Sequence, residues 1–280
     1  SLLFIPTGYK ESKIYSVFPT TGVGDFTFNR NSSATRIAKN GLITSVATDI
    51  PRLEYPLIDG VVNGCPSLLL EPSRTNLVTY SNTTSQWVDS GVTHSANDII
   101  SPDGGLNATK SVVNVGVTTA NTRPMAAAPI TTGLDYVFSV FAKAGEFEKI
   151  TLDFSNSGFE AAEATYNLTT GTVTAFYGLN VNQGIEDYGN GWYRCYIVAT
   201  AIATGTTPLI LRFDDNPTGN GVDGLYFYGA SFEQGSYPTS YIPTNGTTVT
   251  RAADTANGAG DATTFNDSEG VLMVETKLLT

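Results

Sequence analysis

The chain has few of the side chains on which common catalytic and metal sites depend. Its 280 residues include one histidine and two cysteines, and only 15% are charged, against ~25% in typical soluble domains. A histidine-rich metal site is therefore excluded. Cys65 and Cys195 lie far apart and outside any CxxC pattern, which argues against metal or redox chemistry. Cys195 alternates with Tyr193 and Ile197, which predicts a buried thiol.

The charge that is present is mostly negative. The net charge is -11 and the pI about 4.4. Nucleic-acid partners call for a basic surface, and anionic membranes attract basic segments, so neither partner is expected. No stretch reaches the ~18 apolar residues of a membrane span, so membrane insertion is not expected either. Neutral partners held by stacking and hydrogen bonds remain, as do divalent cations.

Motifs for catalysis are equally scarce. His94 is the only histidine that a Ser-His-Asp triad could use, and it lies in the polar stretch SGVTHSAND without a nucleophile motif beside it. No P-loop or dinucleotide-binding fingerprint occurs. Glycoside hydrolysis needs two carboxylates ~5–10 Å apart across a sugar, which closeness in sequence does not show. We therefore predict no enzymatic activity. The candidate carboxylate pairs are Glu146/Glu148, Glu160/Glu163, Glu186/Asp187 and Asp214/Asp215.

The residues that are abundant predict an all-β protein. Thr, Ser, Asn and Gly replace the missing charges, and the chain has 28 Gly, 13 Pro, 14 Tyr and 14 Phe. Tyr, Phe, Thr and Val suit half-buried pleated surfaces, while Gly and Pro mark frequent turns. Alternating segments predict about eight strands, which favours a jelly-roll β-sandwich. These strands are 108–113, 135–142, 149–154, 164–167, 173–176, 192–199, 209–213 and 225–232.

Three regions can be predicted along the chain. Residues 1–75 alternate short apolar pieces with turns, including a hairpin around Asn40-Gly41, and are too poor in apolar residues for an independent globule. We expect them to dock onto a neighbouring domain or subunit. Residues 76–243 hold the sandwich. Residues 244–280 are expected to be a polar linker followed by one strand of a further domain.

The stretch from Leu225 to Asp254 marks the junction between the last two regions. It starts as a strand and continues into an irregular connector in which Pro238 and Pro243 fix backbone angles. Tyr237 and Tyr241 can hold this connector by packing. We interpret the two tyrosines as a clamp rather than as ligand contacts.

Candidate binding residues are aromatic or acidic. Trp87, Tyr177 and Tyr188 lie beside polar or Gly-rich sequence and could stack on a sugar, although tryptophans more often close a sandwich core. The loop that carries Asp214, Asp215 and Asp223 offers hard oxygen ligands for calcium. It lacks the EF-hand spacing, and its Asp, Asn, Pro and Gly residues also suit a plain turn.

Three long motifs resemble those of bacteriophage tail-fibre and related virion proteins. They are GYKESKIYSVFPTTGVGDFTFNRNSSATRIAKNGLI at 8–43, PRLEYPLIDGVVNGCPSLLLEPSRTNLVTYS at 51–81, and YGASFEQGSYPTSYIPT at 228–244. The middle region is similar to the carbohydrate-binding jelly roll of such proteins. The tail from Val249 resembles the entry into a laminin-G or concanavalin-like sandwich.

The resemblance implies a structural virion protein, either a tail fibre or a capsid or tail appendage, that contributes to adsorption on host-surface glycans. Its implied partners are other virion proteins and copies of itself, for instance in a trimer, and no cofactor beyond the calcium considered above is implied. Two alternatives stay open. The chain could be a virion spacer without sugar affinity, or the non-catalytic part of a polysaccharide-degrading tailspike.

Overall fold

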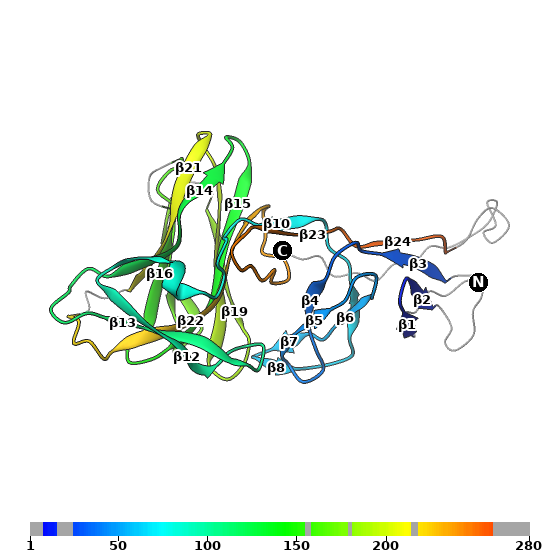
Figure 1. Cartoon of the computed structure of the whole chain (residues 1–280), viewed down its shortest axis with the longest axis horizontal. Coiled ribbons are helices and arrows are strands. Elements are labelled where there is room, and N and C mark those ends of the chain that lie inside the picture. The colour runs from blue at the N-terminus through cyan, green and yellow to red at the C-terminus, as the bar shows by residue number, and fades with distance from the viewer. Residues whose placement is uncertain (1–7, 16–24, 155–157, 179–180, 214–217, 260–280) are drawn as a thin grey trace.

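A computed structural model describes residues 8–15, 25–154, 158–178, 181–213 and 218–259. Within these ranges the chain is an all-β protein whose main body is a β-sandwich, which confirms the predicted fold class. Figure 1 shows the sandwich at one end and a β-rich N-terminal region beside it. None of the described segments is a helix with the length and apolar character needed to cross a membrane.

Two six-stranded sheets form the sandwich within the described ranges. Sheet one has the order β11-β14-β21-β16-β17-β18, and sheet two has the order β12-β13-β22-β15-β20-β19. The chain crosses between the sheets several times, for example from β13 to β14 and from β14 to β15, so each sheet is built from distant parts of the sequence. The strands of sheet one are β11 (Val88–Ser90), β14 (Asn121–Ile130), β16 (Lys149–Asp153), β17 (Glu163–Asn167), β18 (Thr172–Tyr177) and β21 (Gly205–Phe213). Those of sheet two are β12 (Val92–Ile100), β13 (Leu106–Val113), β15 (Asp135–Ala144), β19 (Asn182–Asp187), β20 (Trp192–Thr200) and β22 (Gly224–Gln234).

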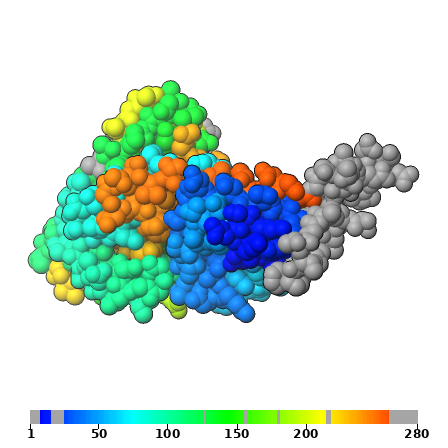
Figure 2. Space-filling model, turned by 45° about the vertical axis from the view of Figure 1, so that its right-hand side comes forward, coloured from blue at the N-terminus to red at the C-terminus, as the bar shows by residue number. Residues whose placement is uncertain are grey.

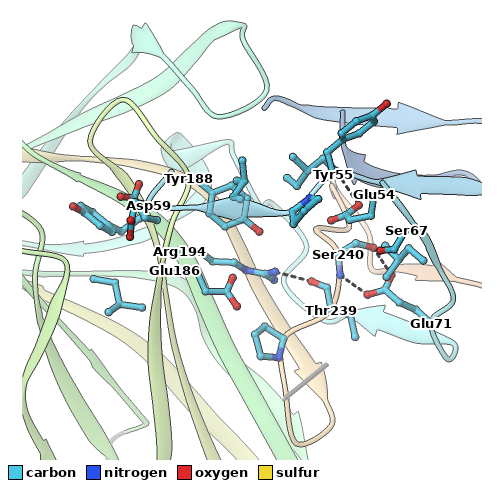
Figure 3. A pocket seen from close by; sticks show the side chains of 18 of the residues that line it. Glu54, Tyr55, Asp59, Ser67, Glu71, Glu186, Tyr188, Arg194, Thr239 and Ser240 are labelled. Atoms are coloured by element: carbon cyan, nitrogen blue, oxygen red, sulfur yellow. Dashed lines mark hydrogen bonds between the residues drawn. The ribbon is translucent and has the colours of Figure 1, made fainter. Parts of the chain in front are cut away.

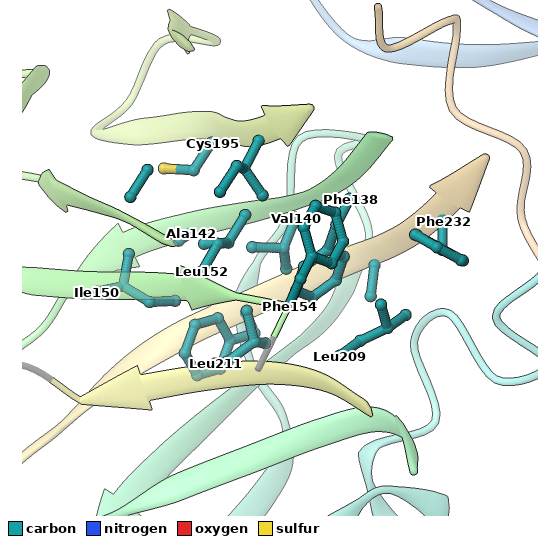
Figure 4. Packing of buried hydrophobic residues seen from close by; sticks show 14 of the residues in the cluster. Phe138, Val140, Ala142, Ile150, Leu152, Phe154, Cys195, Leu209, Leu211 and Phe232 are labelled. Atoms are coloured by element: carbon teal, nitrogen blue, oxygen red, sulfur yellow. The ribbon is translucent and has the colours of Figure 1, made fainter. Parts of the chain in front are cut away.

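The core lies between the two sheets, where alternate residues of each strand point inward. Figure 4 shows Phe138 of β15 beside Phe154, with Leu209 and Leu211 of β21 close by. Each fully buried side chain of this size contributes about 1.5–3 kcal/mol relative to an exposed one. Cys195 of β20 has no exposed surface, which confirms the predicted buried thiol, and burial raises the pKa of that thiol.

Each of the eight predicted strands corresponds to a strand of the sandwich, but four others were not predicted. β14 escaped prediction because it contains Pro124 and Pro129, which normally argue against a strand. On one edge of β14, the short strand β11 pairs only with residues 121–123. Pro124 and Pro129 lie beyond this pairing, so neither has to donate a backbone N–H to β11. β12 escaped because a register shift between Ser95 and Ile99 interrupts its alternation. β11 and β19 are also additions.

The N-terminal region consists of short strands in small sheets. The predicted Asn40-Gly41 hairpin is confirmed, with Ile37 of β4 paired to Ile43 of β5 and Gly41 at φ 80°. The apolar run at Leu68 to Leu70 includes part of β9, and Leu70 is 46% exposed. The strands are β1 (Gly8–Lys10), β2 (Lys13–Tyr15), β3 (Phe26–Asn29), β4 (Ala34–Ile37), β5 (Ile43–Val46), β6 (Arg52–Glu54), β7 (Leu57–Ile58), β8 (Val61–Val62) and β9 (Ser67–Leu69). One 3-10 helix, η1 (Thr84–Gln86), follows β10 (Arg74–Asn76).

A second apolar cluster joins the N-terminal region to the sandwich. Phe141 of β15 and Trp192 of β20 meet Ile37 and Ile43 of the β4–β5 hairpin there, and Tyr241 packs against Phe141 at 5.9 Å between ring centroids. The Tyr241 hydroxyl also lies 2.7 Å from Ser81 Oγ, which confirms that Tyr241 clamps the connector. The N-terminal region is therefore docked through its own buried contacts.

The segment after the connector returns to the N-terminal region. β23 (Val249–Arg251) pairs with β10, and β24 (Thr255–Asn257) pairs with β3. Figure 2 shows this part of the chain, in orange, lying against the blue N-terminal region. Residues 249–257 are thus not a free linker, because their polar, Thr-rich strands have pairing partners more than a hundred residues earlier. The strand expected from Gly270 onward lies outside the described residues.

Candidate functional site: a cleft above a buried ionic joint

Three buried arginines hold the N-terminal region and the C-terminal segment together. Arg30 and Arg52 have no exposed surface, and Arg251 is 1% exposed. Arginine is rarely fully buried unless it is paired, so each must meet acceptors in the interior. We call Arg30, Arg52, Glu71, Arg251 and Asp254 together the ionic joint.

Asp254 binds two of these arginines at once. Its Oδ1 lies 3.1 Å from Arg30 Nη1, and its Oδ2 accepts a hydrogen bond from Arg52 Nη2. The same Oδ2 accepts the Glu71 backbone N–H at 2.9 Å. A single carboxylate thereby ties β6 and the residue after β3 to a segment some two hundred residues later in the chain.

Glu71 is the second anion of the joint. Its Oε2 lies 2.7 Å from Arg52 Nη1 and 3.0 Å from Arg251 Nη1, and its Oε1 accepts the Ser240 N–H at 2.8 Å. Burial would raise the pKa of Glu71, but the charges of Arg251 and Arg52 outweigh that effect and lower it. Glu71 therefore stays ionised in the interior.

All three long sequence motifs contribute to this one structure. Arg30 belongs to the first motif, Arg52 and Glu71 to the second, and Ser240 to the third. Arg251 and Asp254 lie within about ten residues after the end of the third motif. The long motifs therefore encode a joint between segments, and the joint itself is too deeply buried to contact a partner.

An open cleft of about 750 Å³ lies above the joint, between the N-terminal region and the edge of the sandwich. One wall comes from β6, β7, β9 and the turns beside them, and carries Glu54, Tyr55, Asp59 and Ser67. Figure 3 shows Glu54 and Ser67 across from Tyr188, Arg194 and Glu186 of the sandwich, and Asp59 beside Tyr188. The floor is formed by the connector residues 238–240. The full lining is Ile37, Glu54, Tyr55, Pro56, Leu57, Asp59, residues 67–71, Thr170, Gly171, Ile185, Glu186, Asp187, Tyr188, Tyr193, Arg194, Pro238, Thr239 and Ser240.

Two glycines bring the walls together at one place. A Cβ atom on Gly60 would lie 2.6 Å from the Gly189 Cα, and one on Gly189 would lie 2.5 Å from the Gly60 carbonyl oxygen. Both residues also have positive φ, 70° and 78°, which favours glycine. The β7–β8 turn and the turn after β19 can therefore touch only because Gly60 and Gly189, the residues at the contact, have no side chain.

Glu54 is the most perturbed carboxyl group of the cleft. Burial raises its pKa to about 7, although the Ile37 N–H, which donates to Glu54 Oε2 at 2.9 Å, lowers it in part. Glu54 is therefore partly protonated near neutral pH and can then donate as well as accept a hydrogen bond.

Replacing Glu54 with glutamine should stabilise the protein at alkaline pH. Because the folded pKa exceeds the ordinary value of 4.5, the contribution of Glu54 is fully present below about pH 4.5 and is lost as pH rises through about 7. We expect the free energy of unfolding of E54Q to exceed that of the wild type by about 1–3 kcal/mol at pH 8, and to differ little from it at pH 4.5. Urea denaturation at both pH values measures this, and a gap that does not change with pH would contradict it.

The structure places the three predicted sugar-binding residues in different environments. Tyr188 lines the cleft and packs edge-on against Phe141 at 4.8 Å. Tyr177 is 64% exposed on the edge strand β18 and does not line the cleft. Trp87 is 6% exposed in the sandwich core and donates its indole N–H to the Tyr80 carbonyl oxygen at 2.8 Å. A sugar therefore cannot stack on Trp87, whose rings are covered by core packing.

The predicted calcium loop is only partly within the described ranges. Asp214 and Asp215 lie outside them, and Asp223 is partly buried with its N–H donated to Asn220 Oδ1 at 2.8 Å. In the part of the chain that the structure describes, no three His, Cys, Asp or Glu side chains are grouped as a metal site would require.

His94 lies in an arrangement that superficially resembles a catalytic triad. Its Nδ1 is 2.7 Å from Ser111 Oγ, and its Nε2 is 2.9 Å from Asp89 Oδ1. Ser111, however, has no exposed surface and lies on β13 between β12 and β22. A substrate cannot reach its hydroxyl, so the chain of hydrogen bonds joins strands rather than forming a nucleophile site.

Comparison with known proteins adds little to this geometry. No protein-family model matches the chain, and no curated protein matches it. One solved structure that the chain matches weakly contains the CBM22-1 and GH10 modules of the endo-1,4-β-D-xylanase Xyn10B from Clostridium thermocellum in complex with xylohexaose. The TM-score is 0.33 and the sequence identity is 14%. The match covers 61% of this chain and 30% of the xylanase chain. A likeness this low carries no argument about function.

Proposed function

We propose that this chain is a structural component of a phage virion, of the tail-fibre or appendage class, that adsorbs to host-surface glycans through the cleft. The observation that carries the glycan-binding part is the cleft itself. It combines the tyrosine rings of Tyr55, Tyr188 and Tyr193 with carboxylate and hydroxyl groups, and about 750 Å³ can hold several sugar rings. Sugars need such a combination of aromatic faces and polar groups.

The virion part of the proposal is supported by the three motifs and by the joint that they build. A protein that anchors a binding domain to a particle needs a stiff connection, and buried ion pairs supported by hydrogen bonds supply one here. The partners would be other virion proteins and further copies of this chain. Several copies, for instance three, would raise a weak affinity per site through multivalency.

We propose a binding role and not a catalytic one. Glu54, Glu186 and Asp187 all line the cleft, but Glu54, whose pKa burial raises to about 7, already has a structural role. Glu54 accepts the N–H of Ile37 and thereby contacts the β4–β5 hairpin beside the cleft. The joint would serve a spacer without sugar affinity equally well, so the cleft has to be tested directly.

A glycan array with matched variants tests the proposal. The full chain is displayed in many copies on beads, as wild type, as Tyr55→Ala and as Tyr177→Ala. Tyr55 lines the cleft, and no hydrogen bond of its hydroxyl is part of the joint, so its ring can be removed with little effect on the fold. Losing a buried aromatic contact should weaken binding about tenfold.

We expect the wild type and Tyr177→Ala to bind the same glycans and Tyr55→Ala to lose most of the signal. No signal from the multivalent wild type would overturn the glycan-binding role and leave the spacer. Loss of binding in Tyr177→Ala alone would move the site from the cleft to the edge strand β18.

A further inference from the structure

Acidic side chains outnumber basic ones in the lining of the cleft. Four carboxyl groups, Glu54, Asp59, Glu186 and Asp187, lie in its walls and outside the ionic joint. The one lysine or arginine among the described lining residues is Arg194. The cleft is therefore acidic in a protein whose overall charge is already -11.

Arg194 offsets part of the charge of Glu186, but its guanidinium group is buried and held by the protein, so it is not free to bind an anionic ligand. It is 3% exposed, and it donates to the Thr239 carbonyl oxygen at 2.7 Å and to Ser139 Oγ at 3.2 Å. It also lies over the Phe141 ring at 5.4 Å from the centroid. An acidic ligand would therefore meet like charge without a free cation to pair with.

The carboxylates are distributed along the walls. They do not form a group of three that could hold a metal ion within the described part of the chain. Asp59 lies at the β7–β8 turn, whereas Glu186 belongs to β19 and Glu54 to β6. The rings of Tyr55 and Tyr193 lie in the same lining. Spread carboxylates beside aromatic rings suit an extended ligand with several cationic groups, through charge-assisted hydrogen bonds and cation–π contacts.

We infer, building on the proposed function, that the cleft selects glycans carrying free amino groups and rejects acidic sugars. Each protonated amine would donate to a wall carboxylate while the sugar ring lies against a tyrosine. Uronic or sialic acid groups would be repelled and would lose their hydration without a partner.

Three sugar tetramers of equal length test this inference: one of glucosamine, one of N-acetylglucosamine and one of galacturonic acid. Isothermal titration at about pH 6 should show the glucosamine tetramer binding at least tenfold more tightly than the acetylated one, and the galacturonic acid tetramer not binding. Raising the salt concentration should weaken the first interaction, because the wall carboxylates are partly exposed.

A double variant, Asp59→Asn with Glu186→Gln, should bring the glucosamine tetramer to the affinity of the acetylated one. Both changes keep the side-chain shape, and Asn tolerates the positive φ of 49° at position 59. Glu160→Gln, which removes an exposed carboxylate that does not line the cleft, should have no effect.

The outcomes separate the inference from the proposed function. Equal binding of the glucosamine and acetylated tetramers, or tighter binding of the acidic one, would overturn the charge selection. If that binding still depended on Tyr55, the cleft would remain a glycan site. Absence of binding by any tetramer, together with a silent glycan array, would overturn both.

Discussion

Replacing Arg52 with methionine should cost about 3–5 kcal/mol of the free energy of unfolding. Arg52 is fully buried and donates to Glu71 at 2.7 Å, to the Thr35 carbonyl oxygen at 3.0 Å and to Asp254. Methionine keeps much of the apolar stem but leaves these two carboxylates with one arginine partner each, in an interior that disfavours charge. Urea denaturation measures the loss directly.

The control for this prediction is Arg212→Met. Arg212 also pairs with two carboxylates, Asp153 and Glu163, but its side chain is 37% exposed, so the loss should be below about 1 kcal/mol. If R52M and R212M lowered the free energy of unfolding by the same small amount, the ionic joint would stabilise the fold no more than a surface ion pair does.

The second large effect should follow from cutting the chain at the boundaries of the predicted sandwich. A fragment of residues 76–243 loses the β4–β5 hairpin that covers Phe141 and Trp192, so it exposes an apolar patch. We expect this fragment to aggregate or to unfold without a cooperative transition. A fragment of residues 25–259 keeps the hairpin, the joint and β24, and should unfold in one sharp transition.

Calorimetry on both fragments checks this expectation. A cooperative transition of fragment 76–243 near the melting temperature of the longer fragment would contradict it. The sandwich would then be an independent domain, and the N-terminal region an appendage that adds no stability.

The sandwich was the part of the structure that the sequence predicted best. β16 alternates Ile150 and Leu152 with polar residues, and in β21 buried and partly exposed residues alternate, because one face of each strand lies in the core. β14 was missed because its prolines contradict that pattern. β23 and β24 were missed because pairing between residues 251 and 74, or 255 and 29, leaves no local signal.

The cleft was harder to predict than the fold. Tyr188 was a candidate because it stands beside Gly-rich sequence, but Glu54, Tyr55, Asp59 and Arg194 were not singled out as site residues. They come together only when residues 54–71 dock on β19 and β20, which neither spacing nor periodicity expresses. The one available signal was the Asp59-Gly60 turn, whose missing side chain permits the contact with Gly189.

Mapping of amide chemical shifts with a bound glycan tests the central claim most directly. The isotope-labelled chain is titrated with the best ligand from the array. The account predicts that amides on both walls, around Tyr55 and Ser67 and around Tyr188 and Tyr193, shift together with one affinity. Shifts confined to β18 around Tyr177, or to one wall only, would contradict the claim that the joint creates a binding cleft between the two parts.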